Sequence, residues 1–261
     1  MVHLKSMPQK RRRENLLLAA LPEAERERLD PFLTLIEMQV GMPVTEPDEP
    51  IPYLYFPYDA VTSTTQEMSD GSMIETGLMG IEGLAGVQVW LGQRSTAATT
   101  FVQVPGTGHR MATEDFIREV RDNAASPLND LVRSYVHAFL VLTSLVAACN
   151  RLHPIDQRLC RWLCMTYNRA RRTEYPLRHE FLSQMLGVQR PTLSTAASML
   201  QRAGLITYRY GKLTITNPDG LVTGACECYA LMESQFDKIF DQPWRARITL
   251  PEASGHSSSY K

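Results

Sequence analysis

The chain lacks an excess of charge of either sign. Its 261 residues include 27 Lys and Arg against 28 Asp and Glu, so the formal net charge is −1 at pH 7. A protein that attracts nucleic acid through its overall charge would be strongly basic, and this one is not. Any nucleic-acid site must therefore be a local cluster of basic residues.

Cysteine is scarce and is missing from the first half of the sequence. The five cysteines are Cys149, Cys160, Cys164, Cys226 and Cys228. An odd number in this arrangement is not the disulfide framework of a secreted domain, and a reducing cytoplasm is expected. Cys226 and Cys228 are too close together, without further ligands beside them, to predict a zinc site. We expect the other three to be small core residues, and no metal.

A long hydrophobic run near the amino terminus is also missing. The basic residues at 10–13 are followed by only a short apolar run, at 16–20. That run is far too short to span a membrane. No export signal is evident, and we expect a cytoplasmic protein without membrane contact.

Between residues 40 and 104 short apolar runs alternate with turn residues. The length of the chain favours two modest domains, and 44% hydrophobic residues suffice for real cores. The runs lie at 53–56, 61–64, 74–78, 87–91 and 101–104. This spacing predicts an antiparallel barrel or sandwich of jelly-roll type. Ahead of it, residues 16–32 predict two short helices, the second opened by Pro22.

After Pro127 apolar residues recur at spacings of three and four. They are Leu128, Leu131, Tyr135, Ala138, Leu142, Leu145, Cys149 and Leu152. This heptad stripe favours a long helix that pairs in parallel with a second copy across a twofold axis. The alternative is a single helix buried against its own barrel. The pair His153-Pro154 ends the helix and predicts a hinge.

The most informative segment is residues 179–200, which predicts a helix-turn-helix. Apolar residues at 181–186 form one helix face, and Gly187 permits a tight turn. A second helix starts at Gln189–Pro191 and buries Leu193, Ala196, Ala197 and Leu200. Slim polar residues on its outer face suit insertion into the major groove of DNA.

A basic hairpin follows this helix. Gly204 ends the helix, and residues 207–215 alternate around a turn at Gly211, which predicts a wing. A helical hairpin used only for packing is the alternative. The predicted DNA contacts are Arg178, His179, Gln189, Arg190, Pro191, Thr192, Ser194, Thr195, Arg202, Arg209 and Lys212.

These residues resemble the Crp/Fnr family of bacterial transcription regulators over about residues 14–230. The resemblance is most specific at 181–206 and at 149–152 leading into Arg158-Leu159. It implies an α+β chain: a β-roll of cyclic-nucleotide-binding type at 14–126, a dimerisation helix at 127–153, a winged helix-turn-helix at 154–230, and a carboxy-terminal helix and tail at 231–261. It also implies a homodimer on a palindromic site that contacts or blocks RNA polymerase. Of the recognition-helix residues in the family members that read the best-known operator, only an arginine is matched here, by Arg190. We therefore expect this chain to bind a different operator sequence.

The resemblance also points to an effector site. Family members bind the ribose of a cyclic nucleotide with a Gly-Glu pair, where this chain has Gly83-Leu84 beside Glu82. Arg94-Ser95 or Thr96-Ala97 occupies the place of the phosphate-binding pair, depending on the alignment. Thr143-Ser144 resembles the pair that reaches the base. A cyclic nucleotide is thus a doubtful cofactor, and the roll is expected to serve dimer geometry or another effector.

Two other classes of function remain open at this point. A β-roll enzyme would need a group of His and carboxylate ligands, and only His109 lies in the predicted barrel, so no catalytic residues are expected. Iron–sulfur sensing, another family property, needs amino-terminal cysteines that are missing here. A sensor without DNA binding is disfavoured by Arg190 and the basic wing. The sequence therefore favours a sequence-specific DNA-binding regulator.

Overall fold

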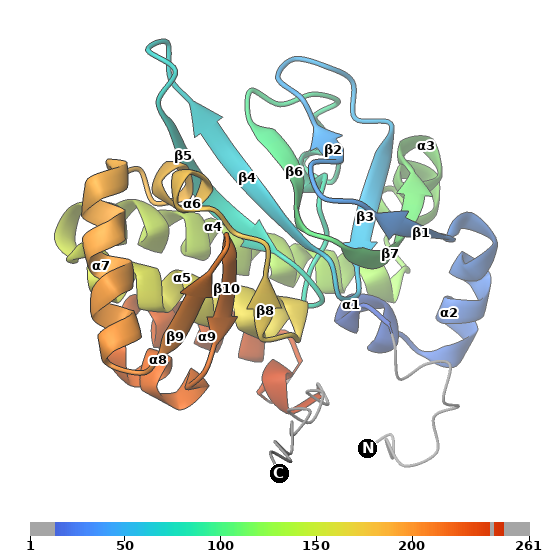
Figure 1. The fold of residues 1–261 in the computed structure, drawn as a ribbon. Coiled ribbons are helices and arrows are strands. Elements are labelled where there is room, and N and C mark those ends of the chain that lie inside the picture. The colour runs from blue at the N-terminus through green and yellow to red at the C-terminus, as the bar shows by residue number, and fades with distance from the viewer. Residues whose placement is uncertain (1–13, 241–242, 248–261) are drawn as a thin grey trace.

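The computed structural model describes residues 14–240 and 243–247. The basic residues 10–13 and the Ser-rich segment expected to form a tail lie outside the described residues. Figure 1 shows a roll of strands, a long helix α4 running behind it, and a second group of helices around a small sheet. This α+β arrangement confirms the predicted fold class.

Two antiparallel sheets form the roll, with strand orders β1-β7-β3 and β2-β6-β4-β5. The strands are β1 (Thr34–Met38), β2 (Pro43–Thr45), β3 (Tyr53–Pro57), β4 (Val61–Glu67), β5 (Met73–Met79), β6 (Thr99–Val104) and β7 (Gly106–Ala112). Leu54, Val102 and Met111, from three strands, are at most 1% exposed. Residues from both sheets thus share one apolar core.

The prediction of a strand at 87–91 is wrong. Val87–Val89 form a short 3-10 helix after Gly86, whose φ is +91°. The N–H groups of Val89 and Trp90 bond to carbonyls three residues earlier instead of to a neighbouring strand. The alternation of apolar and polar residues at 87–91 does not by itself reveal that the chain turns at Gly86 and continues as a 3-10 helix.

Three strands of the roll were not expected from the sequence: β1, β2 and β7. Strand β7 contains Gly106 and Gly108, and glycine is a poor strand former. It lies between β1 and β3 and pairs with both along its length. Its strand conformation therefore depends on its two neighbours more than on its own residues.

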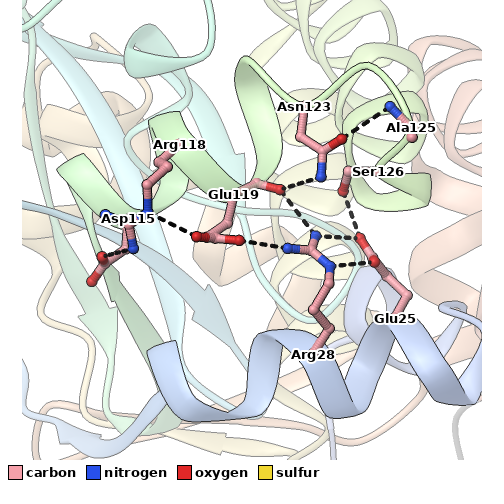
Figure 2. A network of polar contacts seen from close by, with 8 residues as sticks. All are labelled: Glu25, Arg28, Asp115, Arg118, Glu119, Asn123, Ala125 and Ser126. Atoms are coloured by element: carbon pink, nitrogen blue, oxygen red, sulfur yellow. Dashed lines mark hydrogen bonds and ion pairs between the residues drawn. The ribbon is translucent and has the colours of Figure 1, made fainter.

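The two predicted amino-terminal helices are present as α1 (Leu16–Ala19) and α2 (Glu23–Leu29). Figure 2 shows how ion pairs fasten α2 to the segment before α4. Arg28 bonds Glu25 in its own helix, and its Nη1 lies 2.6 Å from Glu119 Oε2 in the π-helical turn Ile117–Arg121. Ser126, the N-cap of α4, donates to Glu25 at 2.6 Å. Two parts of the chain that lie 91 to 101 residues apart in sequence are held together here.

The long helix α4 spans Pro127–Leu152. Its predicted heptad stripe is mostly buried within the chain: the exposed fraction is 0% for Leu128, Tyr135, Leu142 and Cys149. Ala138 is 1% exposed, Leu131 and Leu145 are partly buried, and only Leu152 is largely exposed. Helix α9 (Cys228–Asp237) covers part of the stripe, and the rings of Tyr135 and Phe236 lie 6.2 Å apart.

Most of the stripe is therefore covered within the chain, which favours the alternative of a helix buried against its own roll, and the role of the stripe in a dimer stays a prediction. The period of three and four residues arises because α4 packs on its own roll and on α9. The sequence could not separate these cases, since both bury one face of a helix.

The opposite face of α4 is the one left open. Leu140, Ser144, Ala147, Ala148 and Arg151 are exposed, Leu140 to 55%. Within the described residues α4 is the one helix long and apolar enough to cross a membrane, by length and composition only. A single such helix is weak support for a membrane span, and an uncovered apolar face suits a partner helix equally well.

The second half of the chain begins with α5 (Ile155–Ala170) and continues through a small mixed domain. Its other elements are β8 (Glu174–Tyr175), α6 (His179–Met185), α7 (Arg190–Arg202), β9 (Ile206–Arg209), β10 (Lys212–Ile215), α8 (Pro218–Gly224), α9 and a 3-10 turn at Trp244–Arg247. The predicted carboxy-terminal helix is thus α9, and it starts at Cys228, three residues before the expected boundary at 231.

A buried ion pair joins this half to the roll. Arg169 of α5 is 0% exposed, and its Nε lies 2.7 Å from Oε1 of Glu82, which is also 0% exposed. Its Nη1 lies 3.4 Å from Glu233 Oε1 of α9. The guanidinium also lies 5.4 Å from the ring centroids of Phe236 and Trp244.

A second buried polar group lies where β5 meets α5. Glu75 accepts hydrogen bonds from Ser63 Oγ at 2.6 Å and from Trp162 Nε1 at 3.0 Å. Ser63 Oγ also bonds Gln103 Oε1. Burial raises the pKa of Glu75 to about 7. The contact between the roll and the second half therefore contains a carboxyl group that changes charge near neutral pH.

Candidate nucleic-acid interface

Helices α6 and α7 form the predicted helix-turn-helix. Helix α6 ends at Met185, and α7 begins at Arg190 after its N-cap Gln189. Gly187 in the turn has a φ of +60°, where a side chain would be strained. A Cβ at this position would also lie 2.6 Å from Ile74 Cδ1 on the β4–β5 hairpin. The turn thus requires glycine for its backbone and for the close approach of the roll.

Helix α7 has the buried and exposed sides that the sequence predicts. Leu193, Ala196, Ala197 and Leu200 are 0 to 4% exposed and hold the helix on its domain. The outward residues are Gln189, Arg190, Pro191, Thr192 and Thr195, with Ser194 partly buried. A face of slim polar residues lets a helix approach base edges closely.

His179, at the start of α6, links the exposed helix to the wing. Its Nδ1 lies 3.0 Å from Ser194 Oγ of α7, and its ring meets the ring of Tyr208 edge-on with centroids 4.4 Å apart. Burial lowers the pKa of His179, with a smaller contribution from Arg190. The imidazole is therefore mainly neutral near pH 7 and joins α6, α7 and β9.

The hairpin β9–β10 is the predicted wing, turning at Tyr210 and Gly211, whose φ values are +51° and +76°. Strand β8 adds a third strand beside β10. Tyr210 stands fully exposed at the tip. This tyrosine is not among the DNA contacts predicted from the sequence, although its place beside the turn glycine is a usable signal.

Four exposed basic side chains lie on the elements that flank α7 or at its end. Arg178, Arg202, Arg209 and Lys212 are all exposed. Arg178 precedes α6, Arg202 ends α7, and the other two lie on the wing. Lys212 forms an ion pair with Glu174 of β8. Arg190 stands at the amino end of α7, so five cations lie on the helix-turn-helix and wing of a nearly neutral chain.

Comparison with known families agrees with this geometry. A family model described as the Crp-like helix-turn-helix domain matches residues 157–223. The protein carries a Crp-like helix-turn-helix domain. The matched range contains the whole of α6, α7 and the wing, so the Crp-like domain is the unit that presents the exposed helix.

Solved structures share the fold of about three quarters of the chain. FixK2 from Bradyrhizobium japonicum matches with a TM-score of 0.61 at 14% identity, over 74% of this chain and 98% of that one. A CRP-family transcriptional regulator from Thermus thermophilus gives 0.59 at 13%, over 73% and 96%.

The c-di-GMP-responsive regulator CLP from Xanthomonas campestris gives a TM-score of 0.58 at 15% identity, over 74% of this chain and 99% of that one. No curated protein sequence gives a significant match. The Crp-like domain and the shared fold confirm the resemblance to Crp/Fnr regulators and support a DNA-binding transcription regulator.

Several of the residues predicted for an effector site in the roll are used in contacts within the chain. Glu82 is fully buried and bonded to Arg169, and Leu84 is 0% exposed. Gly83 packs so closely on Tyr135 that a Cβ there would lie 2.1 Å from the ring. The 82–84 loop is therefore used for packing against α4 and α5.

The other predicted effector residues lie at the surface. Arg94 is 53% exposed and pairs with Glu114, and Ser95 beside it is exposed. The hydroxyls of Thr143 and Ser144 both donate to the carbonyl of Leu140 within α4. Glu82, Arg94, Thr143 and Ser144 are thus each engaged by contacts within the chain, and their role in an effector site stays a prediction.

A different group of polar side chains is brought together by the fold. The ligand atoms of Cys149, His153, Cys226 and Cys228 all lie within 4.8 Å of one another. Two further side chains that could bind a metal therefore lie beside Cys226 and Cys228, where the sequence predicted none. No signal in the sequence joins them, since about 75 residues separate the two halves of the group and α4 must end beside the start of α9.

Proposed function

We propose that this protein is a sequence-specific DNA-binding transcription regulator that acts as a homodimer on a palindromic site. The exposed face of α7 carries the proposal: Arg190, Pro191 and Thr195 point outward while Leu193 and Ala197 anchor the helix. In this function α7 enters the major groove. Two copies of α7 would lie about 34 Å apart to reach successive grooves on one side of the duplex.

The side chains divide into base-reading and phosphate-binding groups. Arg190, at the amino end of α7, reaches a guanine edge or a phosphate, and Thr195 and Pro191 suit a thymine methyl group. Arg178, Arg202, Arg209 and Lys212 bind phosphates on either side of the groove. His179 and Ser194 bond to each other, so we assign them mainly to positioning α7 against the wing.

The proposed dimer uses the exposed face of α4. Leu140, Ala147 and Ala148 offer an apolar strip along this 26-residue helix, and residues 14–240 and 243–247 leave that strip uncovered. Helices that pair along such strips are common in dimers of twofold symmetry. The roll then sets the distance between the two recognition helices.

The remaining roles follow from the same proposal. The protein acts in a bacterial cytoplasm, contacts or blocks RNA polymerase once bound to DNA, and has no enzymatic activity. An effector other than a cyclic nucleotide is favoured, because Glu82 is occupied by Arg169. The roll reaches the DNA-binding domain directly where Ile74 meets the turn at Gly187.

Selection of bound sequences from a random DNA pool tests the proposal, followed by binding measurements on the selected site. We expect a palindromic site and a steep loss of affinity as salt rises. Arg190→Ala should weaken binding to that site by about 1 to 3 kcal/mol and relax one base preference. Lys212→Ala should weaken all sequences alike.

Arg118→Ala is the matched control, because it removes an arginine that is 58% exposed and lies outside the Crp-like domain. It should leave affinity and base preference unchanged. If Arg190→Ala keeps the full base preference of the wild type, or if the pool yields no enriched sequence, the assignment of α7 as recognition helix is wrong.

A further inference from the structure

Three thiols and one imidazole converge where the long helix ends. Cys149 lies in the last turn of α4, and His153 follows one turn later as its C-cap. Cys226 and Cys228 come from the segment that leads into α9. The result is a Cys-x3-His pair facing a Cys-x-Cys pair.

The distances between the ligand atoms suit a tetrahedral metal ion. Cys149 Sγ lies 3.5 Å from Cys226 Sγ, and Cys228 Sγ lies 3.6 Å from His153 Nδ1. With zinc–sulfur bonds of about 2.3 Å and zinc–nitrogen bonds of about 2.0 Å, a tetrahedron separates two sulfurs by about 3.8 Å and sulfur from nitrogen by about 3.5 Å. All six pairs lie within 4.8 Å, so small shifts would complete the shell.

The histidine is already oriented as a ligand. Its Nδ1 faces the sulfur of Cys228, while Nε2 lies 3.1 Å from Glu227 Oε1. A carboxylate on the far nitrogen of a metal-binding histidine fixes the tautomer and makes the other nitrogen a better ligand. Glu227 is therefore placed to support His153 in this way.

Burial and charge fit the same ion. The three cysteines are at most 5% exposed, whereas the side chain of His153 is 17% exposed and leaves a route from solvent. Three thiolates and one neutral imidazole around Zn²⁺ carry a net charge of −1. Arg161, 3% exposed, lies close enough to Cys149 for a favourable charge interaction and balances that charge.

We propose that Cys149, His153, Cys226 and Cys228 bind one structural Zn²⁺ ion. Thiolate and imidazole ligands in a closed tetrahedron select zinc over magnesium, calcium or manganese. The ion ties the end of α4 to the start of α9 across the hinge at His153-Pro154. It thereby fixes the orientation of the DNA-binding domain relative to the long helix.

Metal analysis of the full chain, purified under reducing conditions without chelator, tests the site. We expect about one zinc ion per chain in the wild type. Cys228→Ala and His153→Ala should lose most of the zinc. His153→Cys should retain it, because four thiolates also bind zinc, and a purely structural role of His153 would give no such rescue. Cys160→Ala is the matched control, since Cys160 is an equally buried cysteine outside the group.

Two further measurements remain informative if a variant folds poorly. Co²⁺ exchanged into the wild type should give the intense visible bands of a tetrahedral site with thiolate ligands. A strong chelator should lower the melting temperature of the wild type but not that of Cys228→Ala.

Absence of zinc from reduced wild type, a Cys149–Cys226 disulfide in its place, or bound iron with iron–sulfur absorption would each overturn the proposal. So would full zinc content in Cys228→Ala. Zinc content is measured without DNA, so its outcome is independent of the recognition-helix test.

Discussion

Replacing Arg169 by methionine should be among the most damaging substitutions in the described chain. Arg169 and Glu82 are both 0% exposed, and Glu233 is 1% exposed. The substitution removes the cation and leaves the buried carboxylate of Glu82 without this partner, whereas Glu233 keeps Arg245, 3.7 Å away. Breaking a buried pair in this way costs about 3 to 5 kcal/mol. That is a large part of the roughly 5 to 15 kcal/mol by which a typical protein is stable.

Urea unfolding followed by circular dichroism at pH 7.5 measures the loss. The double variant Glu82→Leu/Arg169→Met should recover more than half of it, because both charges of the pair are then gone. Arg169 Nη2 and Glu82 Oε2 are buried without a hydrogen-bond partner among the described residues. Removing these two unpaired polar atoms should also help the double variant to regain stability.

Arg118→Met serves as the surface control, with an expected change below about 0.5 kcal/mol. A loss below about 1 kcal/mol in Arg169→Met would refute the argument. So would a double variant as unstable as the single one, since the penalty would then not come from an uncompensated charge.

Two further predictions concern pH and assembly. The pKa of Glu75 is about 7 in the folded protein against 4.5 for an unperturbed carboxyl group. The contribution of Glu75 to the free energy of unfolding is therefore fully present below pH 4.5 and is lost as the pH rises through 7. The total loss is about 3 kcal/mol. Glu75→Gln should lack this slope in urea unfolding between pH 4.5 and 7.5, and parallel profiles would contradict the assignment. Leu140→Arg should shift the proposed dimer toward monomer in analytical ultracentrifugation while Arg118→Ala, a change at an exposed arginine outside α4, does not. An unchanged mass would exclude this face of α4.

Local sequence patterns predicted the DNA-binding domain well. The burial of Leu193 and Ala197, the glycine at 187 and the hairpin around Gly211 depend on neighbours within a few residues. Helix periodicity and turn chemistry therefore suffice to place these elements. The exposed side of α7 follows from the same pattern, because the residues left over must face outward.

The sequence predicted the type of the roll, an antiparallel β structure, but not all of its strands. Strand β7 contains two glycines and forms because β1 and β3 pair with it on either side. The 87–91 segment alternates like a strand, but Gly86 turns it into a 3-10 helix. Strand pairing joins residues that are distant in sequence, and the pattern of apolar and polar residues within one segment does not predict it.

The sequence by itself determined that a Crp-like helix-turn-helix and wing exist, and that a long helix with one apolar stripe precedes them. Only the tertiary structure decided that this stripe faces its own roll and α9, and that Glu82 forms a buried ion pair with Arg169. It also brought Cys149 and His153 to Cys226 and Cys228. The physical reason is distance along the chain: periodicity and turn residues act over a few positions, whereas these contacts join segments about 75 to 90 residues apart.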